Sequence, residues 1–167
     1  MTIAVEGIGQ QLTPGEATTG SLYTGWMVDS AVLCLGIQHP IDFDAGHVLI
    51  LAGDRIPPLS IVTIREIAGP RIAVEGALVV RPFSTDESAV PPVLRAFPTP
   101  QDGDLAVLEG IDPMVILPAP DGQGRWCINL NTGKSTKGDW KGAVYIRAWE
   151  MIERTGRDDE RVLARFG

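Results

Sequence analysis

The chain is poor in the residues that most often carry out chemistry. Its 167 residues include two histidines, two cysteines and three lysines, and aromatic side chains make up only 6%. The cysteines do not form the spaced pattern of a disulfide framework or a zinc knuckle, because Cys34 lies in the apolar stretch AVLCLGI and Cys127 in RWCINL. We expect two buried thiols. A disulfide between Cys34 and Cys127 remains an alternative if the strands that contain them are neighbours.

Long apolar runs are also missing. None approaches the roughly 20 residues that cross a bilayer as a helix. The first residues, MTIAVEGIGQQ, lack a basic segment followed by an apolar one. The sequence therefore predicts neither a membrane span nor a signal peptide, and we expect a cytoplasmic protein. The length and a hydrophobic fraction of 44% favour one packed domain over residues 1–167.

Basic residues are scarce in the first three quarters of the chain. Residues 1–124 contain 15 acidic and 5 basic side chains, a balance of −10, whereas residues 125–167 contain 6 and 9, a balance of +3. An acidic body repels the phosphate backbone, so a nucleic-acid ligand is not expected. The charge instead suits a basic protein partner.

Short strands divided by Gly, Pro and Asp dominate the first 130 residues. The alternation in 59–67 and 71–81 predicts an antiparallel hairpin with its turn at 68–70. Apolar and β-branched residues predict further strands over 21–28, 30–37, 47–53, 114–118 and 125–130. Residues 82–104 contain five prolines, which indicates a Pro-rich surface connection with at most one edge strand near 93–97. That connection is a candidate partner-facing loop.

The hydrophobic period changes near the C-terminus. In residues 142–156, Val144, Ala148 and Ile152 recur at spacings of four, which predicts an amphipathic helix. Acidic residues at the start of 157–167 and Arg165 near its end predict a second helix. The expected fold class is therefore α+β, with a mainly antiparallel, strongly curled sheet covered by one or two C-terminal helices.

The stretch IQHPIDFDAGH, residues 37–47, contains both histidines of the chain. His39, Asp42, Asp44 and His47 are residue types that bind a divalent metal or act as general acid and base. The histidines are eight residues apart, so only a loop that folds back on itself would bring them together. We favour a polar turn in which Asp42 or Asp44 caps backbone donors, and keep the metal site as the alternative.

The stretch NTGKST, residues 131–136, resembles the end of a phosphate-binding loop. A glycine would have to occupy position 128 of such a loop, and that residue is Ile128, so we interpret the stretch as a β-turn. All the lysines lie nearby, among aromatic residues. A binding surface for an anionic or stacking ligand is the functional hypothesis for Lys134, Lys137, Trp140 and Lys141.

No set of residues forms a recognisable catalytic motif, and no cofactor is expected. With so few histidines, any Ser or Cys triad would have to use His39 or His47. The favoured function is a non-enzymatic, acidic protein-binding module, of the immunity or inhibitor type or a phage or assembly component. The alternative is a small enzyme or a metal-dependent ligand binder that uses His39, Asp42, Asp44 and His47.

Overall fold

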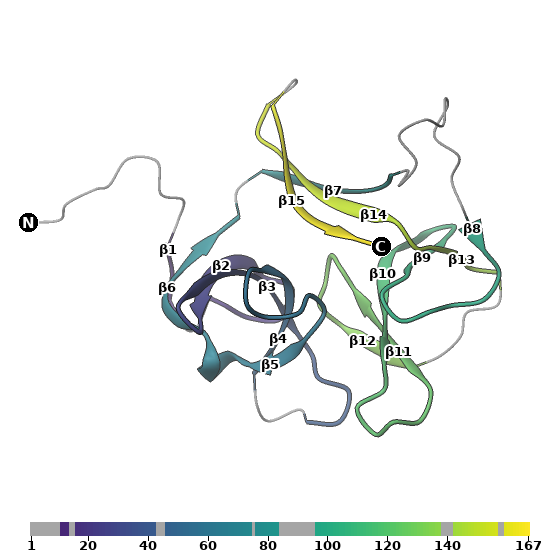
Figure 1. Ribbon diagram of the computed structural model, residues 1–167, viewed down its shortest axis with the longest axis horizontal. Coiled ribbons are helices and arrows are strands. Elements are labelled where there is room, and N and C mark those ends of the chain that lie inside the picture. The colour runs from purple at the N-terminus through teal and green to yellow at the C-terminus, as the bar shows by residue number, and fades with distance from the viewer. Residues whose placement is uncertain are drawn as a thin grey trace, which may run out of the picture.

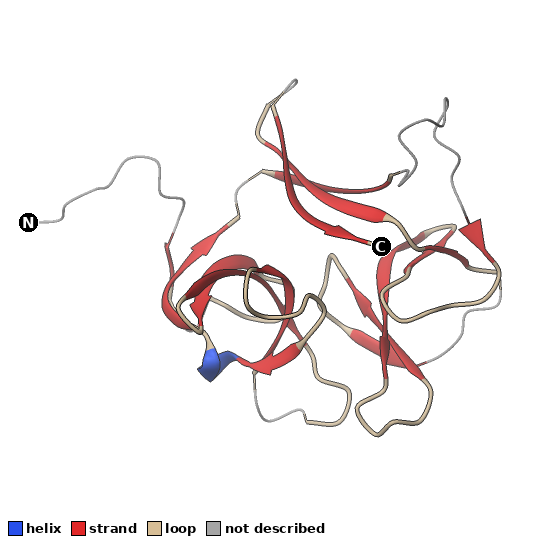
Figure 2. Cartoon of the chain, viewed as in Figure 1, coloured by secondary structure: helices blue, strands red, loops and turns tan. Residues whose placement is uncertain are grey.

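The protein is built from short antiparallel strands. The computed structural model describes residues 11–13, 16–42, 46–74, 76–83, 96–137, 142–156 and 159–167, with the backbone alone at position 96. The strands are β1 (Gln11–Leu12), β2 (Leu22–Met27), β3 (Ser30–Ile37), β4 (His47–Gly53), β5 (Ile61–Thr63), β6 (Ala68–Ala73), β7 (Ala77–Pro82), β8 (Ala96–Phe97), β9 (Leu105–Leu108), β10 (Ile111–Pro118), β11 (Arg125–Asn129), β12 (Ser135–Lys137), β13 (Val144–Ile146), β14 (Trp149–Arg154) and β15 (Glu160–Phe166). Within the described residues, the only helical element is the 3-10 turn η1 (Ile64–Glu66) (Figure 2).

Three sheets divide these strands. The first sheet has the order β1-β6-β2-β3-β4-β5, the second β12-β11-β10-β9-β13-β8, and the third β15-β14-β7. In Figure 1 the first and second sheets lie side by side, and the third sheet runs above them. Of the described residues, no helix is long and apolar enough to cross a membrane.

The central strands of the first sheet are buried on both faces. Successive side chains of a strand point to opposite faces. In β3, Leu33 and Leu35 face the cluster shared with the other sheets, whereas Val32 and Cys34 face a smaller cluster inside the curl of their own sheet. This double burial explains why β3 and β4 are nearly continuous apolar runs.

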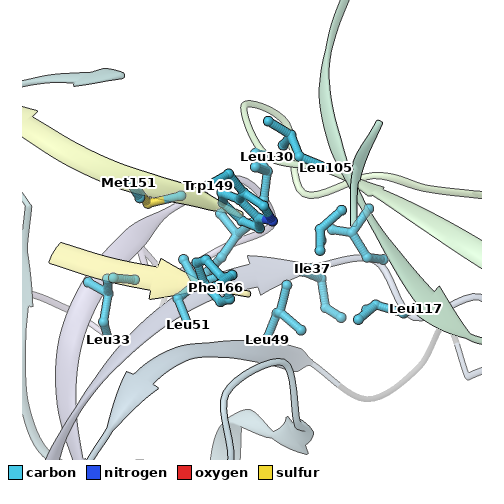
Figure 3. Packing of buried hydrophobic residues seen from close by; sticks show 14 residues of the cluster. Leu33, Ile37, Leu49, Leu51, Leu105, Leu117, Leu130, Trp149, Met151 and Phe166 are labelled. Carbon is cyan, nitrogen blue, oxygen red and sulfur yellow. The ribbon is translucent and has the colours of Figure 1, made fainter. Parts of the chain in front are cut away.

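The shared cluster receives side chains from all three sheets (Figure 3). At its centre Trp149 is 0% exposed and stacks on Phe166, with ring centroids 4.0 Å apart. The Trp149 indole N–H donates to the carbonyl oxygen of Gly103 at 2.9 Å, so the one polar atom of the ring is also satisfied. The prediction of a single domain over 1–167 stays a prediction.

The predicted C-terminal helices are wrong, and with them the α+β class. Residues 142–156 form β13 and β14, and residues 160–166 form β15, so the described part of the chain is almost entirely β. β14 is the central strand of the third sheet and pairs with β7 in continuous register from Trp149 to Arg154. Its residues from Trp149 to Glu153 are all buried, so the hydrophobic pattern lacks the period of two that marks a strand with one solvent-facing side.

Buried acidic side chains on β14 also made the helix pattern misleading. On an amphipathic helix Glu150 would face solvent, but it is 3% exposed and lies between two arginines of the neighbouring strands. Arg81 and Arg165 each donate from Nε to Glu150 at 2.8 Å. Burial alone would raise the pKa of Glu150, but these charged hydrogen bonds hold it below its ordinary value.

The predicted hairpin of 59–67 with 71–81 is also wrong. β5 pairs with β4, β6 pairs with β1 and β2, and β7 pairs with β14. The expected turn at 68–70 lies inside the strand β6, which runs along β2 opposite Trp26. The local alternation identified strands but not their partners, because pairing is decided by burial against residues far away in sequence.

The Pro-rich connection lies partly outside the described residues, at 84–95. Its end is well anchored, because Phe97 pairs with Tyr145 and the guanidinium of Arg147 lies 3.5 Å from the centre of the Phe97 ring.

The two cysteines are buried thiols that belong to different clusters. Burial raises the pKa of Cys34 to about 12, so this thiol stays protonated at neutral pH.

Candidate functional site

A pocket of about 410 Å³ lies where the first and second sheets meet. One wall comes from the edge of the first sheet and the other from the end of β10 and the turn that follows it. Its lining is mostly apolar and comprises Leu59, Ile61, Val62, Leu117, Pro118, Ala119 and Pro120, with His39, His47, Thr63 and Glu66 as the polar members. An apolar pocket of this size with a few polar groups is the usual form of a binding site.

The pocket contains both histidines. Their rings stack, with centroids 4.3 Å apart and planes inclined by 29°. His47 begins β4, whereas His39 follows β3, so the loop between these paired strands folds back and brings the imidazoles together. The described part of the loop contains a turn in which Nδ1 of His39 accepts the backbone N–H groups of Ile41 and Asp42, and the cap by Asp42 or Asp44 stays a prediction.

These hydrogen bonds determine which ring nitrogen of neutral His39 carries the proton. Since Nδ1 accepts two N–H groups, the neutral ring carries its proton on Nε2. Burial lowers the pKa of His39, the neighbouring His47 lowers it further, and the carboxylate of Asp42 acts in the opposite direction. The Nε2 atom of His47 lies 3.8 Å from a carboxylate oxygen of Asp42.

The geometry does not favour one metal ion bound by both histidines. A metal is bound in the plane of an imidazole ring, about 2.1 Å from its nitrogen. The planes of the two stacked rings are inclined by 29°, so they intersect much farther from either ring nitrogen than a metal–nitrogen bond reaches. Among the described residues, no group of three His, Cys, Asp or Glu side chains could hold a metal ion. Asp44 lies outside those residues, so the four-residue metal site stays a prediction.

Glu66 is a pocket residue that we did not select from the sequence. One of its carboxylate oxygens accepts the backbone N–H of Thr63 at 2.9 Å and the Thr63 hydroxyl at 3.0 Å. These two hydrogen bonds, with a smaller contribution from His47, lower the pKa of Glu66 and keep it charged. The signal was present in the sequence, since Thr63-Ile64-Arg65-Glu66 has the spacing of a capping box.

Leu59 holds the pocket wall in a strained conformation. Its φ of 65° is in the left-handed region, which is rare for a bulky side chain. The conformation is maintained because the Leu59 N–H donates to Ile50 and its side chain packs against the shared cluster. Such strain persists only where the surroundings enforce it, and it occurs most often in binding and active sites.

No protein-family model, characterised protein or solved structure is significantly similar to this chain. The pocket is where apolar surface, charge and backbone strain coincide.

The basic region predicted around Lys134 is separate from the pocket. Lys134 is exposed in the turn after β11, and Lys137 is exposed on β12, directly opposite Trp126. Trp140 and Lys141 lie outside the described residues. The hypothesis of an anionic or stacking ligand at this site therefore stays a prediction.

We expect the stability of the protein to fall as the pH drops through about 6.5, the ordinary pKa of histidine. Because the folded chain holds the pKa of His39 below that value, the unfolded chain takes up the proton first. The stabilisation is complete above the unfolded pKa and is lost as the pH falls toward the folded one. Denaturant unfolding at pH 7.5 and pH 5.5 measures this loss.

The matched variant for this experiment is His39→Asn. An Asn side-chain oxygen accepts backbone N–H groups two and three residues ahead, as His39 does, but it does not titrate. We expect the variant to lose less stability than the wild type between the two pH values. Equal losses in both proteins would show that His39 is not the group responsible.

Proposed function

We propose that this chain is a non-enzymatic binding protein that receives a long cationic side chain of a basic protein partner in the pocket. The observation that carries the proposal is the combination of a mostly apolar cavity with a fixed carboxylate, Glu66, at its edge. Lysine and arginine have apolar stems and charged heads, so they complement both parts of such a pocket.

The charges around the pocket support this choice of ligand. Glu66 is exposed, and the Thr63 groups that donate hydrogen bonds to it are neutral, so the carboxylate retains its full charge. Asp42 adds a second carboxylate beside His47. The chain as a whole carries a net charge of −7, which would attract a basic partner over a longer range.

A protein of the immunity or inhibitor type, or an assembly component, would use such an acidic binding surface. We include a cytoplasmic location in the proposal, because both cysteines are buried thiols, as is usual in a reducing compartment. Binding rather than catalysis is favoured by the histidine pair, since Nδ1 of His39 is already occupied by backbone donors.

The proposal predicts that Glu66→Gln weakens partner binding. A suitable probe is a random 12-residue peptide library displayed on phage and selected against the wild-type protein. We expect the enriched peptides to contain Arg or Lys, and to bind Glu66→Gln at least about threefold more weakly and with less salt dependence, as for loss of one exposed ion pair. Fluorescence anisotropy of the labelled peptides measures both effects.

Gln preserves the oxygen that accepts from Thr63, so Glu66→Gln removes the charge and leaves the turn intact. The control is Glu109→Gln, which removes the same charge from an exposed turn between β9 and β10. Peptides that lose affinity equally for both variants would respond to net charge alone. That result, or a selection with no Glu66-dependent peptide, contradicts the proposed function.

A further inference from the structure

Among the described residues, the strand β5 is an open edge of the first sheet next to the pocket. It is the last strand of the first sheet and pairs on one side with β4. A sheet edge of this kind can accept an additional strand from another chain. The pocket lies beside it, since Ile61, Val62 and Thr63 all contribute to the lining.

The hydrogen-bond pattern shows which atoms of β5 face outward. The carbonyl of Ser60 accepts from Ile50 and the N–H of Ile64 donates to Gly46, so residues 60, 62 and 64 point their backbone groups toward β4. By alternation, Ile61 and Thr63 point theirs away from β4. The outward Thr63 N–H donates to Glu66, and the C=O of Thr63, the N-cap of η1, accepts the first bond of that turn, which leaves the N–H and C=O of Ile61 facing outward among the described residues.

Prolines flank this edge and keep it open. Pro57 and Pro58 precede β5, and Pro118 and Pro120 form the opposite wall of the pocket. Proline has no backbone N–H, and the N–H of Ala119 between the latter two prolines donates to Gly124, so none of these three residues donates a backbone hydrogen bond to β5. Within the part of the chain that the structure describes, the edge is unpaired on the side where the pocket opens.

We infer that the partner presents an extended, basic segment, which adds to β5 as a further strand and directs one cationic side chain into the pocket. Every second side chain of such a strand would point to the face that contains His47 and Thr63, so one residue enters the pocket while its backbone pairs with Ile61. This inference rests on the proposed function. It specifies the backbone conformation of the bound segment.

The experiment uses the Glu66-dependent peptides from the phage selection. Each peptide is resynthesised with single N-methyl groups along its backbone, which remove one N–H at a time. We expect alternate positions to lose at least about tenfold in affinity and the positions between them to change little, because only every second N–H of an added strand faces β5.

A variant of the protein tests the other side of the same pairing. Ile61→Pro removes the outward N–H and does not disturb the ladder with β4, whereas Ile61→Ala shortens the side chain and keeps the N–H. We expect Ile61→Pro to lower peptide affinity at least about tenfold relative to Ile61→Ala. Thermal unfolding of both variants checks that the fold is retained, and the N-methyl series decides the question if Ile61→Pro does not fold.

The outcomes separate the two proposals. Peptides that require Glu66 but tolerate N-methylation at every position would overturn strand addition and leave the proposed function standing. If no selected peptide depends on Glu66, both proposals are wrong. An alternating N-methyl pattern together with the loss in Ile61→Pro supports an added strand.

Discussion

Replacing Gly133 by alanine should lower the free energy of unfolding by at least about 3 kcal/mol. Alanine at this position would combine a left-handed backbone conformation with overpacking against neighbouring backbone atoms. The φ of Gly133 is +67°, and a Cβ atom at this position would overlap the carbonyl oxygen of Gly36 and lie 2.7 Å from the nitrogen of Gly20. Both are backbone atoms, which cannot move as a flexible side chain can. The free energy of unfolding from a urea titration measures the loss.

The matched control is Gly122→Ala. Gly122 has a φ of +72°, close to that of Gly133, but a Cβ there would meet no atom within 4 Å. This variant therefore incurs the conformational cost alone, about 1 kcal/mol. The difference in the free energy of unfolding between the two variants measures the cost of steric overlap where Gly133 approaches the backbone of the first sheet. Equal losses of stability in the two variants would contradict the close approach of the Gly133 backbone to that of Gly36.

The position of Gly133 also affects the candidate site. The Gly133 carbonyl accepts the N–H of Gln38, the residue directly before His39. The turn after β11 in the second sheet thereby holds the end of β3, from which the histidine loop starts. We therefore expect Gly133→Ala to weaken peptide binding as well as folding. The stretch that resembled a phosphate-binding loop has a structural role: its glycine allows two backbones to approach closely.

The sequence was most informative where pairing is local. The strands of 21–28 and 30–37 were recognised, and β2 and β3 do form a hairpin, with Val28 and Asp29 in its two-residue turn at positive φ. β10 and β11 likewise pair as neighbours. Non-local pairing left no comparable signal. β7 joins β14, about 70 residues later in the chain, through contacts such as Arg81 with Glu150, which no local period reveals.

The candidate site could be predicted only in part, for the same reason. The residue types of the stretch 37–47 suggested a site, but the stacking of His39 on His47 depends on how the loop between β3 and β4 folds back. The opposite wall, around Pro118, comes from another sheet. Glu66 was the exception, because its capping pattern with Thr63 is a local signal that we did not follow.

The second large effect is expected for Trp149→Ala, which should lower the free energy of unfolding by about 3–5 kcal/mol. Trp149 is fully buried, stacks on Phe166, and donates its indole N–H to Gly103. Truncation removes a large apolar area and leaves the carbonyl of Gly103 without this donor. Trp26→Ala is the control, because Trp26 is 49% exposed, and we expect it to cost less than about 1 kcal/mol.

The loss at Trp149 also bears on the predicted single domain. The cluster around Trp149 contains residues of all three sheets, so weakening it should destabilise them together. A domain typically has a total stability of about 5–15 kcal/mol, so Trp149→Phe is the milder variant if Trp149→Ala does not fold. We expect one cooperative transition for the wild type and for Trp149→Phe, with coincident curves from far-UV circular dichroism and from hydrogen exchange in the first and second sheets. Two separate transitions would show that the sheets fold as independent units and that the single-domain prediction is wrong.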